Sequence, residues 1–192
     1  MSRLRPILIV LAGLLLAGAL TALVVREHQA RAGGREVALT IQGVDPRDLL
    51  TGHYVAFSLV EPLREAEMCP VTLIGPAARQ GWVALSPKGD PKDNHWQATG
   101  RAADRATAAR LGVLTVKGSA TCLPQEGHQI ELDIGITRFH ASQAQSEQIA
   151  RDIPRWNSNG QAPAYALVSI GQDGHARLTG LLIAGHRIGL DW

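Results

Sequence analysis

The chain has 192 residues, of which 45% are hydrophobic, and its formal net charge is +2. Its basic residues are scattered, without a basic stripe or interleaved aromatic residues, so we expect no nucleic-acid partner. About 155 residues follow an N-terminal apolar segment, which is enough for one domain with its own hydrophobic core.

The apolar segment runs from Ile7 to Val25 and contains no charged residue. At about 1.5 Å per residue, its roughly 19 residues span close to the ~30 Å hydrocarbon core of a bilayer. The sequence therefore predicts a transmembrane anchor, with the lipid bilayer as the partner of residues 7–25. The alternative is a cleaved signal peptide with a small-x-small site at Ala30–Ala32, although such peptides usually have an apolar region of about 7–15 residues.

Basic residues flank the apolar segment on both sides, so their count alone does not decide its orientation. A long domain after a span is translocated largely regardless of charge, whereas a short basic tail usually stays inside. We therefore expect a cytoplasmic tail at residues 1–6, the anchor at 7–25, a linker at 26–36 and an extracytoplasmic domain at 37–192.

Beyond the linker, alternating apolar and polar residues predict a series of strands. In the first of them, Val37, Leu39 and Ile41 share one face. The predicted strands are Glu36–Ile41, His53–Val60, Val71–Ile74, Gly81–Leu85, His95–Thr99, Val113–Lys117, Gln129–Ile136, Ala164–Ile170 and His175–Ile183.

Two short helices are expected among these strands. Ala102–Leu111 is rich in Ala and Arg and has no run of β-branched residues. Ser142–Ile153 begins with a capping box formed by Ser142 and Gln145, and Pro154 follows its end. With about eight strands and no regular βαβ alternation, we predict a mainly β (α+β) fold: an antiparallel sandwich or partly open barrel with one or two short helices.

The clearest local pattern lies between Asp45 and Leu59. Asp45 is a candidate N-cap and Pro46 the first residue of a short helical turn. Gly52 is expected to end that turn with a positive φ. In the strand that follows, Tyr54 lies on the face opposite to Val55, Phe57 and Leu59.

This stretch resembles the GDYXXLXY family of bacterial membrane-anchored proteins, which is named for the motif Gly-Asp-Tyr-x-x-Leu-x-Tyr. Gly52 and Tyr54 match the motif literally. His53 stands in the place of the aspartate, Phe57 in the place of the leucine and Leu59 in the place of the last tyrosine.

Weaker similarities to the family lie elsewhere in the chain. One is Gly135–Phe139, at the place where the family has an aromatic pair and a glutamate, and the other is the C-terminal segment GHARLTGLLIAGHRI. A glutamate that the family has near a helix start is replaced here by Gln143. The resemblance implies an anchor in the bacterial inner membrane and an external, periplasmic domain. It implies no assigned reaction, so no catalytic residue is carried over.

Cys69 and Cys122 are the two cysteines, and each lies close to a proline. Neither has a second Cys or His at a spacing typical of zinc sites. In an oxidising compartment we expect them to form a disulfide, and the alternative is two buried free thiols.

We predict no catalytic residue, no cofactor and no metal site. The histidines are dispersed, so they do not indicate a metal site. For a Ser–Lys hydrolase, Ser58 lies mid-strand, and Lys88 and Lys92 are expected in a polar, solvated loop. This leaves Lys117 as the only lysine candidate. The favoured hypothesis is a non-catalytic partner of another envelope or membrane protein. The alternatives are a hydrolytic enzyme with a site around Gly52–Tyr54, and a β domain that binds a small ligand in an apolar cavity.

Overall fold

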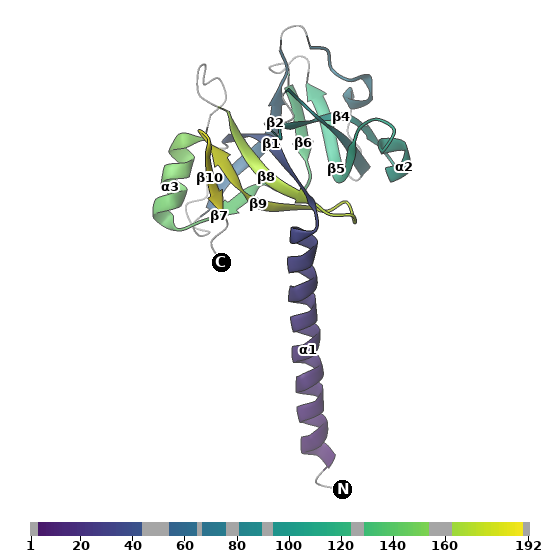
Figure 1. Cartoon of the computed structure of the whole chain (residues 1–192), viewed down its shortest axis with the longest axis vertical. Helices are drawn as coiled ribbons and strands as arrows, with labels where there is room; N and C mark the ends of the chain where they lie inside the picture. Colours follow the sequence, from purple (N-terminus) through teal and green to yellow (C-terminus); the bar gives the residue numbers. More distant parts are fainter. Residues whose placement is uncertain are drawn as a thin grey trace. The chain divides into compact units, whose positions relative to one another are not determined.

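The structure is a computed structural model in which the chain forms two compact units, Met1–Gly34 and Arg35–Trp192 (Figure 1). The residues that it describes are 4–43, 54–64, 67–75, 81–89, 94–123, 129–153 and 163–189.

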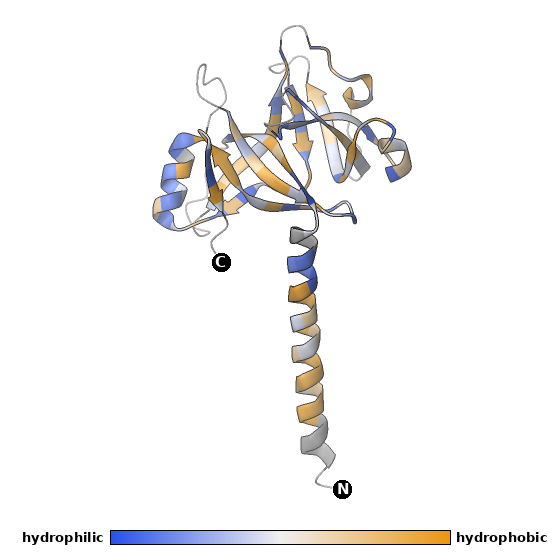
Figure 2. Ribbon diagram, in the orientation of Figure 1, coloured by the Kyte–Doolittle hydropathy of each residue, from blue (hydrophilic) through white to orange (hydrophobic). Residues whose placement is uncertain are grey.

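The first unit is helix α1, Leu4–Ala32. Its segment Ile9–Gln29 is long and apolar enough to cross a membrane, and the hydropathy colouring of Figure 2 shows orange residues along most of its length. Its large apolar side chains are exposed, Ile9 by 72% for example. The predicted apolar helix is confirmed. It continues through most of residues 26–36, which the sequence assigns to a linker, and Gly33 and Gly34 alone separate it from the second unit.

The second unit is built on one antiparallel sheet, which confirms the predicted mainly β fold. Its strand order is β10-β9-β8-β1-β2-β6-β5-β3-β4, and β7 pairs with β2. The strands are β1 Arg35–Gly43, β2 Tyr54–Pro62, β3 Gly81–Pro87, β4 Trp96–Ala102, β5 Leu114–Leu123, β6 Gln129–Asp133, β7 Arg138–His140, β8 Ala164–Ile170, β9 Ala176–Ile183 and β10 His186–Gly189. The short helices are α2 Arg105–Ala108 and α3 Gln143–Asp152.

The two end strands of the sheet, β10 and β4, do not pair with each other, but the start of β4 lies beside β1. Ala38 of β1 forms an isolated parallel bridge with His95, just before β4, and its N–H donates to the carbonyl of Asn94 at 2.9 Å. The strands from β1 through β2, β6, β5 and β3 to β4 therefore enclose a common interior, in the manner of a partly open barrel.

Apolar side chains from this curved sheet form a single core. Val37, Leu39 and Ile41 of β1 are buried on the predicted face, and Phe57 and Leu59 of β2 join them. Helix α3 adds Ile149 to the same core, and the residue at its C-cap, Ile153, is also buried. The capping box of Ser142 and Gln145 begins α3 as predicted.

One predicted strand is wrong. Val71–Leu73 forms a 3-10 helix, η1, because the Leu73 N–H donates to the Pro70 carbonyl at 2.8 Å. Leu73 is buried while Val71 is 84% exposed, so the turn serves to direct one side chain inward. Apolar composition suggested the strand, but a short apolar run does not distinguish a strand from a turn that anchors one side chain.

Candidate functional site

A buried carboxylate lies where four strand ends meet. Glu61 of β2 is 8% exposed, and around it lie Thr40 of β1, Lys88 after β3 and His95 before β4. We call these four residues the Glu61 cluster. The Lys88 ammonium lies 2.7 Å from Glu61 Oε1, and His95 Nε2 lies 2.9 Å from Glu61 Oε2.

The position of Glu61 follows from an interruption of strand alternation. In β2 the side chains alternate up to Leu59, and then Leu59, Val60 and Glu61 are buried in succession. This part of β2 also pairs with β6, on the edge away from β1, and Glu61 lies opposite Ile130 there. A charged residue is thus carried into an apolar surrounding, which is favourable only if the charge is paired and hydrogen-bonded.

The hydrogen bonds of the cluster determine which nitrogen of His95 carries a proton. The Thr40 hydroxyl donates to Glu61 Oε2, so its oxygen is left as an acceptor at 2.9 Å from His95 Nε2. A carboxylate without a proton accepts only, so both neighbours of Nε2 are acceptors. His95 therefore carries a hydrogen on Nε2 and shares it between Thr40 and Glu61.

Burial raises the pKa of Glu61, but hydrogen bonds from His95, Lys88 and Thr40 outweigh it and hold the pKa below the ordinary value of 4.5. The ring of His95 also packs against Tyr165, with ring centroids 5.1 Å apart. A carboxylate that stays ionised and is fully engaged suits neither a general acid nor a nucleophile. The arrangement ties four strands together electrostatically.

Local sequence patterns do not predict the Glu61 cluster. Lys88 was expected in a solvated loop, yet its side chain is only 15% exposed and also approaches Glu67 at 3.2 Å. The available signal was Glu61 itself, a lone acidic residue at the end of an apolar strand. Its partners are 21, 27 and 34 residues away, beyond the reach of any local pattern.

The family motif divides between the core and the edge of β2. Phe57 is 1% and Leu59 3% exposed, so both are packing residues. Tyr54 is half-buried on the other face, with the Arg138 guanidinium 4.9 Å from its ring centroid and the His140 ring at 6.1 Å. Gly52 and His53 lie outside the described residues, and so does the helical turn predicted before them.

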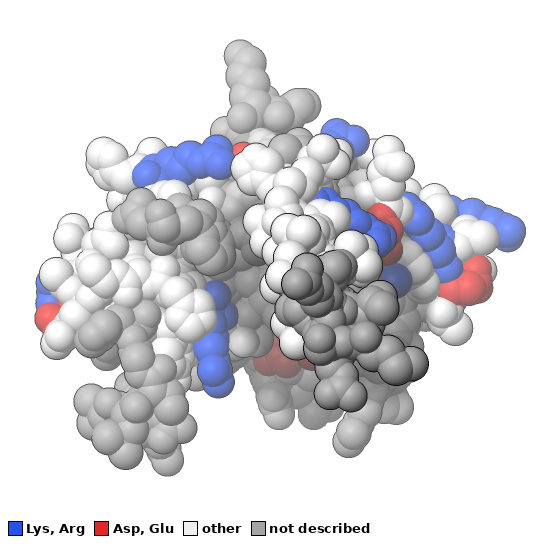
Figure 3. All heavy atoms as spheres, turned by 90° about the horizontal axis from the view of Figure 1, so that it is seen from below, with Lys and Arg blue, Asp and Glu red and all other residues white. Residues whose placement is uncertain are grey.

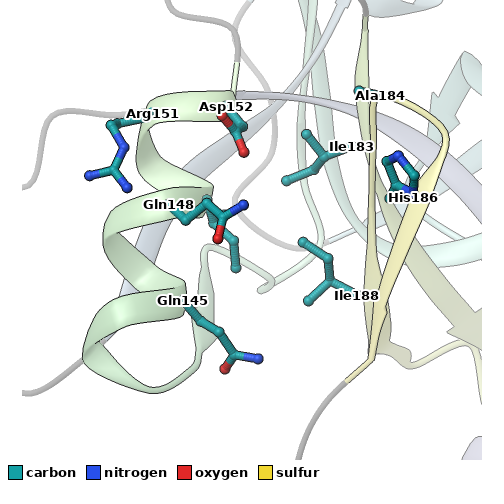
Figure 4. A pocket seen from close by; sticks show the side chains of 9 residues that line it. Gln145, Gln148, Arg151, Asp152, Ile183, Ala184, His186 and Ile188 are labelled. Carbon is teal, nitrogen blue, oxygen red and sulfur yellow. The ribbon is translucent and has the colours of Figure 1, made fainter.

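A groove of about 480 Å³ lies between α3 and the hairpin of β9 and β10 (Figure 4). Ile149 of α3, Ile183 of β9 and Ile188 of β10 line its apolar floor; Ile149 and Ile183 are also core residues, 2% and 6% exposed. Polar side chains surround that surface: Gln145, Gln148, Arg151, Asp152 and His186. In Figure 4 the side chains of Gln148, Ile183 and Ile188 point into the space between helix and hairpin.

Side chains of the described residues pack closely in the interior of the curved sheet. A cavity beside Leu39, Glu61 and Trp96 has a volume of about 10 Å³. This is roughly the space of one water molecule, far below the ~300 Å³ at which ligand pockets begin. The small-ligand hypothesis therefore finds no support in this cavity.

Cys69 and Cys122 form a disulfide with their Cα atoms 5.8 Å apart, which confirms the predicted pairing. The bond ties the segment before η1 to β5. Within the described ranges, no group of three or more His, Cys, Asp or Glu side chains is arranged to hold a metal ion.

Comparison with known proteins gives one match. A family model described as GDYXXLXY protein matches residues 16–181, which is most of the chain. No curated protein and no solved structure matches significantly.

Proposed function

The chain belongs to the GDYXXLXY family, and from that premise we propose that it is a single-pass protein of the bacterial inner membrane whose periplasmic domain binds another membrane or envelope protein. The proposed partner contributes an extended apolar segment that occupies the groove between α3 and the β9–β10 hairpin. The role is non-catalytic. The groove is the observation that carries this proposal.

The chemistry of the groove favours a protein segment over a small polar ligand. Three isoleucines form its apolar surface, whereas the surrounding side chains are amides and charges of both signs. An apolar centre with a polar rim is typical of protein interfaces. A mixed rim does not select a strongly charged partner, so apolar side chains would supply most of the affinity.

The topology of the sheet supports an extended occupant. In the strand order β10 is the terminal strand, paired with β9 from His186 to Gly189. The outer edge of a terminal strand presents backbone N–H and C=O groups that can pair with an added strand. A segment in the groove would combine such pairing with contacts to the partly exposed Ile188 and to the polar side chains of the rim.

The localisation has two supports. Helix α1 has the length and composition of a membrane span. The Cys69–Cys122 disulfide is typical of an oxidising compartment such as the periplasm, and is rare in the cytosol. Together they favour an uncleaved anchor with the domain outside the cytoplasm.

The hydrolytic alternative has less support from the described residues. Tyr54 is in contact with a guanidinium and an imidazole, and the buried carboxylate Glu61 is engaged with His95 and Lys88. A hydrolase would require a nucleophile beside an available base.

Site-specific crosslinking in living cells tests the proposal. A photoreactive residue at position 148, whose side chain points into the groove, is expected to yield one dominant adduct with a membrane or envelope protein. The matched control is position 143, which is exposed on α3 but does not line the groove. The adduct from position 148 should contain an extended segment of the partner, identified by mass spectrometry of the crosslinked peptide.

Groove-filling substitutions provide the second arm of the test. Gln148→Trp is expected to reduce copurification of the crosslinked protein from solubilised membranes at least tenfold, and Gln143→Trp to leave it unchanged. Equal adducts from positions 148 and 143, or copurification that survives Gln148→Trp, would contradict the proposal.

A further inference from the structure

Two basic side chains lie against one tryptophan on the surface of the domain, and a histidine lies beside one of them. Trp82 lies on β3, and the Arg105 guanidinium of α2 and the Lys117 ammonium of β5 lie 5.1 and 5.7 Å from its ring centroid. His175, in the turn between β8 and β9, has its Nε2 3.3 Å from Lys117 Nζ. We call these four residues the Trp82 cluster.

The turn between β8 and β9 is held firmly against β3 and β5. The Lys117 N–H donates to the Gly174 carbonyl at 2.8 Å, and Arg105 Nη1 donates to the Gln172 carbonyl at 2.7 Å. Gly174 has φ +77, and a Cβ atom there would lie 2.3 Å from the Trp82 ring. The Arg105 side chain is therefore held in place by a backbone carbonyl, which lowers the entropic cost of binding an anion there.

The acidic side chains near the cluster bind groups other than the Arg105 and Lys117 side chains. Asp104 caps α2 by accepting from the Thr107 N–H at 2.9 Å. Asp173 binds Arg177 at 3.1 Å and accepts from the His175 N–H at 3.0 Å, and these two contacts lower the pKa of Asp173 to about 2. Within the described part of the chain, neither Arg105 nor Lys117 forms an ion pair. Their two positive charges are thus exposed and not neutralised by a carboxylate.

The cluster is next to the residue by which the domain is attached to α1. Arg35, the first residue of β1, is paired with Ile170, which directly precedes the turn that carries His175. Only residues 30–34 separate the candidate span Ile9–Gln29 from Arg35. Even fully extended, such a connection reaches only about 20 Å. The surface of the membrane that holds α1 is therefore the anionic surface nearest to this part of the domain.

We propose that the Trp82 cluster binds the anionic phosphate headgroups of the bilayer that holds α1, so that the domain docks on its own membrane surface. The proposal rests on the anchored topology of the proposed function. Figure 3 shows more basic than acidic side chains among the described residues on the face that it draws. Basic residues near an anionic lipid surface attract it electrostatically, and tryptophan is favoured at the membrane interface.

The test uses the full-length chain reconstituted in nanodiscs of phosphatidylcholine with or without phosphatidylglycerol. The readout is backbone hydrogen exchange in α2 and in the Gly171–His175 turn. We expect slower exchange in the discs that contain phosphatidylglycerol, and loss of this protection at high ionic strength, where surface charges are screened.

The double variant Arg105→Gln/Lys117→Gln is expected to weaken docking by up to about 30-fold, because it removes two basic residues from the surface. The matched control is Arg64→Gln/Arg138→Gln, which removes the same charge from exposed positions after β2 and on β7. It should retain the protection.

Identical exchange in both kinds of nanodisc would overturn the docking proposal while leaving the anchor intact. Equal loss of protection in the two double variants would also overturn it, because net charge rather than the cluster would then be responsible. Failure of the chain to insert into any nanodisc would overturn the anchored topology and the docking proposal together.

Discussion

Glu61 illustrates how one charged residue can hold several strands in place. It is surrounded by a hydroxyl, an imidazole and an ammonium, each from a different segment. Breaking a buried pair by removing one partner is usually far more costly than the net contribution of the pair, because the remaining charge is left without compensation. The cluster therefore matters most for the closure of β4 onto β1, where Ala38 and His95 form a single isolated bridge.

Glu61→Gln is expected to lower the free energy of unfolding by about 2 kcal/mol at neutral pH, because Lys88 and His95 lose their common carboxylate. The pKa of Glu61 is lower in the folded protein than its ordinary value of 4.5. Ionised Glu61 therefore stabilises the fold above pH 4.5, and this contribution is lost as the pH falls through the folded pKa. Denaturant unfolding of both proteins between pH 7 and pH 3 measures the difference.

The control for this prediction is Glu131→Gln, an exposed residue of β6. It should change stability by less than about 0.5 kcal/mol. A difference between the wild type and Glu61→Gln that does not shrink below pH 4.5 would contradict the assignment of the effect to the ionised carboxylate.

Among the elements, β2 determines the register of most of the domain. It pairs with β1 on one edge, and with β6 and then β7 on the other. The family motif covers its first half, where Phe57 and Leu59 point into the core and Tyr54 points to the opposite face. The substitution of the motif leucine by Phe57 and of the tyrosine by Leu59 keeps these positions apolar, which is what buried positions require.

Phe57→Ala is expected to destabilise the domain by about 4 kcal/mol, since it removes a fully buried aromatic ring and leaves a cavity. Ser58→Ala, at the next position of the same strand, is exposed and should change stability by less than about 0.5 kcal/mol. Thermal or denaturant unfolding of the two variants in parallel measures this contrast. Similar losses for both would mean that β2 does not present alternate faces to core and solvent.

At the scale of the whole molecule, the disulfide links two segments that are 53 residues apart. It joins the region around η1, where Met68 and Val71 are strongly exposed, to the well-packed strand β5. A bond between distant segments restricts the unfolded chain more than a local one does. It therefore stabilises the domain as a whole as well as the surface turn.

The double variant Cys69→Ala/Cys122→Ala should lower the free energy of unfolding by about 4 kcal/mol in the chain-entropy account of disulfides. Unfolding of the full-length protein in detergent, followed by tryptophan fluorescence, measures the loss. Met68→Ala, next to the bond and 89% exposed, is the matched control and should remain close to wild type. In cells, thiol labelling before and after reduction should find both cysteines oxidised; labelling without reduction would argue against an extracytoplasmic domain.

The sequence by itself determined the features that depend on near neighbours in the chain. The apolar helix, the buried face of β1, the capped start of α3 and the mainly β character all follow from local periodicity and composition. The tertiary structure alone decided the rest, because the relevant residues are distant in sequence. Thr40 and His95 are 55 residues apart, and Lys117 and His175 are 58 apart. Alternation shows which face of a strand is buried but not which strand lies beside it, so the order of the sheet is what assembles the Glu61 cluster, the groove and the Trp82 cluster.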